Sequence, residues 1–64
     1  MKTTVILFGL DIDTTFDDSK IFEYTTSNGD VYDEVAITDD GRLIAFDNSA
    51  NAWIQLAGNA NEVL

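Results

Sequence analysis

The chain has 64 residues, of which 45% are hydrophobic, and a formal net charge of −9 from 12 carboxylates against three cations. This length predicts one small domain, residues 1–64, that buries about 60% of its unfolded surface. The sequence has no cysteine, so no disulfide stabilises the domain, and no histidine, which is the commonest general base and zinc ligand. The acidity argues against direct binding to nucleic acid or membrane and favours a basic partner, although an acidic surface also serves solubility alone.

The N-terminal segment contains neither a secretory signal nor a membrane span, because the apolar run 5–10 is too short for both. The chain begins with Met1 and lacks cysteine, so we expect a complete small protein of the cytoplasm, or of the host cytoplasm if a phage encodes it.

The first predicted strand spans residues 3–13. Residues 5–8 are apolar on both faces, which favours a central or covered position, and Gly9 indicates a bulge or bend within the strand. Residues 14–20 are predicted to form a polar connection with one helical turn capped by Thr15, and Phe16 is expected to turn back into the core.

Four more strands are predicted at residues 21–26, 31–38, 42–47 and 52–56, with a looser turn at 48–51. Asn28-Gly29 predicts a type I′ hairpin turn, and Asp39-Asp40-Gly41 has the same turn chemistry. Strict alternation places Val31 on the same face as Val35. Residues 57–64 are expected to form a tail or one helical turn.

The expected fold is therefore all-β: a small five-stranded antiparallel meander, strongly twisted or barrel-like, with at most one short helical turn.

A short acidic motif follows the first apolar run. Asp11-Ile12-Asp13-Thr14-Thr15 resembles the DxDxT motif of haloacid dehalogenase-type phosphotransferases, and Gly29-Asp30 followed by Glu34 resembles the metal-binding motif of that family. The resemblance implies that Asp11 is a nucleophile and Asp13 an acid/base. That family has a doubly wound α/β core several times longer than this chain, so we expect a protein that is not an enzyme and has no cofactor.

The same segment has the alternating oxygen ligands of a calcium loop at Asp11, Asp13, Thr15 and Asp17. An EF-hand requires Gly where Phe16 stands and Glu where Phe22 stands, so we expect no metal site.

Residues 40–47, followed by Trp53, resemble one blade of a quinoprotein-type β-propeller with the pattern DGxLxAxD…W. A propeller needs several blades, so the resemblance implies function only through oligomerisation. The alternative is a plain hairpin with Trp53 in the core.

The leading functional expectation comes from the carboxylates. Asp11 and Asp13 would project from one strand face about 6.8 Å apart, and such rows of charge can replace the phosphates of a nucleic-acid strand. Aromatic side chains would add contacts. The candidate partner-binding residues are Asp11, Asp13, Asp17, Asp18, Asp30, Asp33, Glu34, Asp39, Asp40, Tyr24, Tyr32 and Trp53.

We therefore expect a small acidic inhibitor, similar in type to phage and mobile-element proteins, that occludes the basic groove of a nucleic-acid-handling protein by nucleic-acid mimicry. The alternative is a self-assembling structural or accessory β-protein, a homo-oligomer in which residues 5–8 and Val63-Leu64 pack between protomers.

Overall fold

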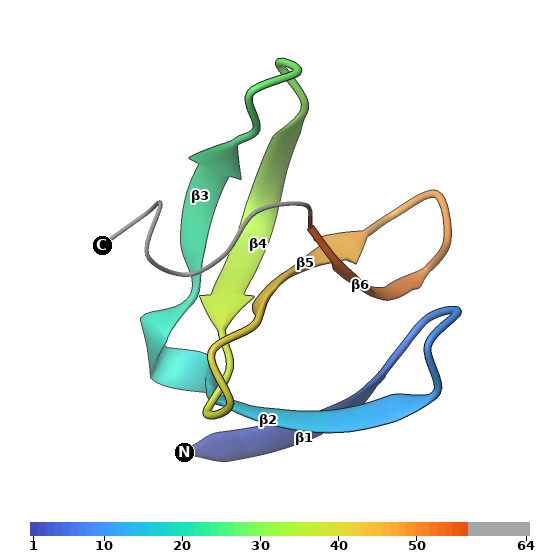
Figure 1. Cartoon of the computed structure of the whole chain (residues 1–64). Helices are drawn as coiled ribbons and strands as arrows, with labels where there is room; N and C mark the ends of the chain where they lie inside the picture. Colours follow the sequence, from blue (N-terminus) through green and yellow to red (C-terminus); the bar gives the residue numbers. More distant parts are fainter. Residues whose placement is uncertain (57–64) are drawn as a thin grey trace.

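The computed structural model describes residues 1–56, and its regular structure is β-sheet apart from one 3-10 helix (Figure 1). In chain order the elements are β1 (Lys2–Leu7), β2 (Ile12–Asp17), η1 (Asp18–Lys20), β3 (Phe22–Thr25), β4 (Val31–Ile37), β5 (Leu43–Asp47) and β6 (Ala52–Gln55). Over this part of the chain there is no helix with the length and hydropathy that crossing a bilayer requires.

The strands form two antiparallel sheets. β1 and β2 pair as a hairpin, and the other four strands form a meander in the order β3-β4-β5-β6. The prediction of an all-β antiparallel fold is confirmed. The prediction of five strands in one sheet is wrong, since residues 1–56 already form six strands in two sheets, and these strands do not close into a barrel.

The first predicted strand is in fact a hairpin. The chain reverses at residues 8–11, where the Leu7 carbonyl accepts hydrogen bonds from the backbone N–H groups of Leu10, at 3.3 Å, and Asp11, at 3.2 Å. Gly9 and Asp11 take positive φ values of 83° and 53°, which the tight reversal requires. Residues 14–17 consequently belong to β2 and pair with β1 instead of forming a polar connection.

The expected helical turn is the 3-10 helix η1, which begins directly after β2 ends and lies within the predicted connection 14–20. Asp17, and not Thr15, caps it, because its carboxylate accepts from the Ser19 N–H at 3.0 Å. Phe16 is buried as predicted, with 1% of its surface exposed.

Two hairpin turns share one geometry. In each, a Thr carbonyl accepts from the Gly three residues later, at 2.9 Å for Thr26 and Gly29 and at 3.0 Å for Thr38 and Gly41. The glycines have φ values of 89° and 86°, whereas Asn28 is not in the positive-φ region. The turns are therefore three-residue loops with glycine in the left-handed position. Both predicted turn positions are confirmed, and the predicted type I′ geometry is wrong.

A β-bulge in β4 overturns the predicted alternation. Tyr24 pairs with Tyr32 and Phe22 pairs with Val35, so that Asp33 and Glu34 together oppose the single residue between the two β3 positions. The extra residue shifts the phase of the strand. Tyr32 therefore shares a face with Val35, while Val31, predicted to be on that face, is 65% exposed.

The four-stranded sheet has an apolar cluster on each face. On one face the β1–β2 hairpin supplies Leu7 and Phe16, which pack with Ala36 and Ile44. On the other face the buried residues are Val35, Leu43, Ala45 and Leu56. Two backbone hydrogen bonds of 2.9 and 2.8 Å tie the hairpin to the sheet, from Phe8 N–H to the Trp53 carbonyl and from Asp39 N–H to the Thr15 carbonyl.

Candidate partner-binding surface

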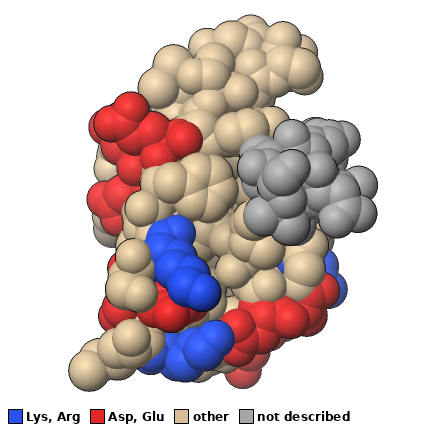
Figure 2. Space-filling model, turned by 90° about the vertical axis from the view of Figure 1, so that its left-hand side faces the viewer, with Lys and Arg blue, Asp and Glu red and all other residues tan. Residues whose placement is uncertain are grey.

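The cations of the chain are concentrated at one end of the molecule. The N-terminal amine lies 3.4 Å from the Asp17 carboxylate and 3.5 Å from that of Asp18, and Lys2 Nζ lies 2.6 Å from Asp39. In Figure 2 the blue side chains lie among red ones in the lower part of the face, and red side chains continue above them. These three carboxylates already have counter-charges within the chain.

Asp40 is the centre of a polar network at the β4–β5 turn. Its carboxylate accepts from the hydroxyls of Thr14, at 3.2 Å, and Thr38, and from Arg42 Nε at 2.8 Å. Arg42 Nη1 also donates to Gln55 at 2.8 Å, which joins the turn to β6. Hydrogen bonding from Thr38, followed by that from Arg42, lowers the Asp40 pKa to about 2. Asp40 therefore has a structural role that the sequence pattern did not indicate.

Asp17 has a similar local role at the end of β2. Its carboxylate accepts from the Ser19 hydroxyl at 2.7 Å as well as from the Ser19 N–H, and these bonds lower its pKa to about 2. The hydrogen bond from Lys2 to Asp39 raises the pKa of the Lys2 amine, and the bond to Asp17 raises the pKa of the N-terminal amine. The charges of Asp17 and Asp39 are thus balanced by cations of the same chain.

The other carboxylates among the described residues have no ion pair within that part of the chain. They are Asp11, Asp13, Glu23, Asp30, Asp33, Glu34 and Asp47, and Asp47 instead accepts from the backbone N–H groups of Ser49 and Ala50. All except Asp47 are exposed. These carboxylates are the ones that a basic partner would reach without first displacing an internal cation.

The bulge creates a group of carboxylates that alternation did not predict. Because Asp33 and Glu34 together oppose Glu23, three exposed acidic residues lie side by side across β3 and β4. Glu23 is not among the residues predicted to bind a partner. It joins them through the register shift of the bulge, which depends on how β3 and β4 pair. We refer to Glu23, Asp33 and Glu34 as the bulge cluster.

The structure separates residues that the sequence placed on one strand. Asp11 lies in the β1–β2 turn, so it does not project beside Asp13 from a common strand face as predicted. Asp13 pairs with Ile6 across the hairpin. The turn between β1 and β2 is at the lower right of Figure 1, whereas β3 and β4 rise on the other side of the molecule. We refer to Asp11 and Asp13 as the hairpin carboxylates. They and the bulge cluster therefore form two separate surfaces.

The aromatic candidates also divide into two environments. Trp53 is half-buried and packs between Phe16 and Phe46, with ring centroids 4.9 and 5.7 Å away, so most of its contacts are internal. Tyr24 and Tyr32 form a cross-strand pair on the opposite face of the sheet.

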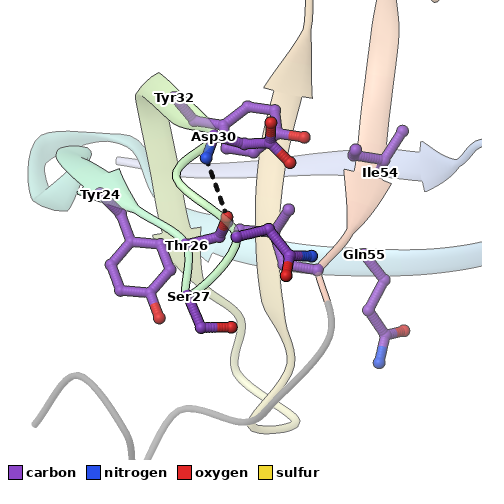
Figure 3. A pocket seen from close by; sticks show the side chains of 9 residues that line it. Tyr24, Thr26, Ser27, Asp30, Tyr32, Ile54 and Gln55 are labelled. Carbon is purple, nitrogen blue, oxygen red and sulfur yellow. Dashed lines mark hydrogen bonds between the residues drawn. The ribbon is translucent and has the colours of Figure 1, made fainter.

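A pocket of about 260 Å³ brings Tyr24, Tyr32 and Asp30 together (Figure 3). Nine of the described residues line it, the others being Thr26, Ser27, Asn28, Ile54, Gln55 and Leu56. β3 and β6 are the opposite edges of the four-stranded sheet, so a pocket lined by both requires strong curvature of that sheet. The Thr26 hydroxyl accepts from the Asp30 N–H at 3.1 Å and fixes the turn that carries the carboxylate.

The alternative sites lack the surroundings that their motifs imply. The described fold has no doubly wound α/β core around Asp11 and Asp13. Asp13, Thr15 and Asp17 lie along the extended strand β2 and not in a loop, and no three metal-binding side chains of residues 1–56 lie close enough to hold an ion. Residues 43–47 and Trp53 form the β5–β6 hairpin of the meander, and residues 1–56 contain one four-stranded sheet, whereas a propeller needs several.

Evolutionary comparison adds no further assignment. Searches with protein-family models, among curated proteins and among solved structures find no match. The functional argument therefore depends on the surfaces described above: the hairpin carboxylates, the bulge cluster and the tyrosine pocket.

Proposed function

We propose that this chain is a small binding protein that occludes a basic surface of a nucleic-acid-handling protein and thereby competes with nucleic acid. The observation that carries the proposal is the distribution of counter-charge. The described cations that form ion pairs do so with Asp17, Asp18, Asp39 and Asp40, which leaves the bulge cluster and the hairpin carboxylates exposed and without internal cations.

The mechanism is electrostatic steering followed by groove occlusion. A net charge of −9 on a molecule of 27 × 25 × 18 Å attracts a cationic groove from a distance and repels nucleic acid. At physiological ionic strength this attraction is screened within about 8 Å, so binding weakens as salt is added. Exposed rim charges act mainly on the association rate, and aromatic contacts are expected to slow dissociation.

The test uses the immobilised protein to capture partners from bacterial lysate at low and high salt, with identification by mass spectrometry. A captured protein is then purified, and its binding to DNA or RNA is measured with and without this chain. The proposal requires competition that salt weakens. A purified partner that binds this chain and nucleic acid simultaneously would refute occlusion.

Neutralising the bulge cluster tests whether it takes part in binding. The variant Glu23→Gln, Asp33→Asn, Glu34→Gln removes the three charges of the bulge cluster, whose side chains make no ion pair within residues 1–56. We expect a slower association rate and an unchanged fold. If the triple variant associates as fast as the wild type, the bulge cluster does not contact the partner.

Self-assembly is the second candidate, and exposed apolar residues favour it. Ile6, Phe8 and Leu10 are 63%, 64% and 49% exposed around the β1–β2 turn. Within the predicted protomer contact 5–8, however, Leu7 is fully buried inside its own chain, and Val63-Leu64 lies outside the described residues. Sedimentation equilibrium decides this question: a monomer at all concentrations would exclude assembly through this surface.

A further inference from the structure

The tyrosine pocket has the chemical features of a site for one organic cation. It combines two aromatic rings with a carboxylate that has no ion pair among the described residues, and Figure 3 places the Asp30 carboxylate on the same side of the pocket as the Tyr32 ring. Cations bind over aromatic faces because the ring quadrupole is negative there. Ile54 and Leu56 add an apolar wall for the alkyl part of such a ligand.

The size of the pocket limits what it can hold. Its volume of about 260 Å³ lies below the roughly 300 to 1,000 Å³ of pockets that enclose drug-sized ligands. One long side chain is therefore a better match than a cofactor or nucleotide, whose phosphates the carboxylate of Asp30 would also repel.

We propose that this pocket binds the side chain of one arginine from the surface of the partner protein. A guanidinium group is planar, so it can stack on a tyrosine ring while its N–H groups donate to the Asp30 carboxylate. This inference rests on the proposed function, which requires a basic partner surface. It adds an anchoring point that is separate from the bulge cluster and the hairpin carboxylates.

The three elements that hold the pocket are fixed independently of any ligand. Tyr24 and Tyr32 are paired across β3 and β4, the Thr26–Asp30 turn has its own hydrogen bonds, and Ile54 belongs to the β5–β6 pairing. A preformed site of this kind spends little free energy on ordering when the ligand binds.

The first experiment titrates the labelled protein with N-acetyl-arginine amide and follows backbone and tyrosine ring signals by NMR. We expect saturable shifts concentrated at Tyr24, Tyr32 and Asp30. The neutral isostere N-acetyl-citrulline amide should give none, because it lacks the charge. N-acetyl-lysine amide, with a free ε-amine, should bind more weakly, because an ammonium group cannot stack.

Matched variants separate the pocket from general acidity. Asp30→Asn and Tyr32→Leu should each weaken arginine binding about two- to fivefold, the range expected for an exposed charge pair or an exposed cation–π contact. Tyr32→Phe retains the ring and should keep the affinity. Asp33→Asn removes an equal charge from the bulge cluster, outside the pocket, and should have no effect. The NMR spectrum of each variant reports directly whether the fold is intact.

Three results would overturn the inference: shifts spread over all exposed carboxylates without preference for the pocket, equal binding of citrulline, or no saturable shift. The probe requires no partner protein, so this result is independent of the capture experiment. If arginine binds but the chain does not compete with nucleic acid, the arginine site is supported and the proposed function is wrong. If the chain competes with nucleic acid but arginine does not bind, the proposed function is supported and the arginine site is wrong.

Discussion

Two neighbouring residues in β1 provide a sharp test of the hairpin. Leu7 is fully buried against Phe16 and Ile44, whereas Ile6, the residue before it, is 63% exposed on the outer face. Truncating a fully buried leucine to alanine costs about 2–5 kcal/mol, from lost transfer free energy and from the cavity that remains. Truncating the exposed isoleucine should change the free energy of unfolding by less than about 0.5 kcal/mol.

The expected difference is large compared with the stability of the whole domain. At about 0.05–0.15 kcal/mol per residue, a chain of 64 residues has a free energy of unfolding of roughly 3–10 kcal/mol. Leu7→Ala should therefore remove about a fifth or more of the stability. One kcal/mol corresponds to a melting-temperature change of about 4–8 °C in a domain of this size, so thermal unfolding easily resolves the two variants.

The assay is urea unfolding followed by tryptophan fluorescence. Trp53 is the one tryptophan of the sequence, and it packs on Phe16 in the cluster that contains Leu7. Its emission should therefore report the loss of hairpin packing directly. The denaturant slope should remain the same in both variants if only stability changes. Equal destabilisation by Ile6→Ala and Leu7→Ala would refute the assignment of faces, since one strand cannot bury two consecutive side chains on the same side.

Three other perturbations have defined outcomes. Asp40 has a pKa of about 2 against an ordinary 3.8, so its stabilising effect is complete above pH 3.8 and is lost as the pH falls through 2. In thermal unfolding, Asp40→Asn should therefore be less stable than the wild type at pH 7. The difference in stability should narrow towards pH 2. Gly29→Ala should cost about 1–2 kcal/mol in urea unfolding because φ is 89°, with nothing within 4 Å of the added carbon, and Gly29→Asn should recover part of that loss. The free energy of unfolding of the double variant Phe8→Ser, Leu10→Ser should lie within about 0.5 kcal/mol of the wild-type value, and the variant should bind less of an apolar dye, because both side chains are exposed. A larger loss of stability would show that these side chains pack against the rest of the domain.

The parts of the fold that could be predicted are those with local causes. The turns at Gly29 and Gly41 depend on the conformational freedom of glycine, which is visible in the sequence. The reversal at residues 8–11 has no Asn-Gly or Asp-Gly pair, and it uses a non-glycine residue, Asp11, in the left-handed region. Composition therefore could not distinguish a turn at Gly9 from a bulge within one long strand.

The candidate surfaces depend on pairing and curvature, which single residues do not encode. The bulge in β4 decides that Asp33 and Glu34 lie beside Glu23, and a shift of one residue would have moved Tyr32 off the face it shares with Tyr24. Tyr24, Tyr32 and Asp30 were singled out from the sequence as partner contacts, a hypothesis that awaits experiment. Their meeting with Ile54 in one pocket follows from the curl of the sheet, a tertiary property.

The placement of the hairpin has a consequence for synthesis of the chain. Leu7 and Phe16 emerge from the ribosome first, but the side chains that cover them, Ile44 and Trp53, are made last. At about 5–20 residues per second, Phe16 waits roughly 2–7 s for Trp53. During that interval the nascent hairpin exposes Leu7 and Phe16 together with its outward-facing Ile6, and an isolated two-stranded hairpin is only marginally stable. Asp11 and Asp13 lie between Leu7 and Phe16 in the sequence, and we expect their charge repulsion to oppose aggregation of emerging chains before folding.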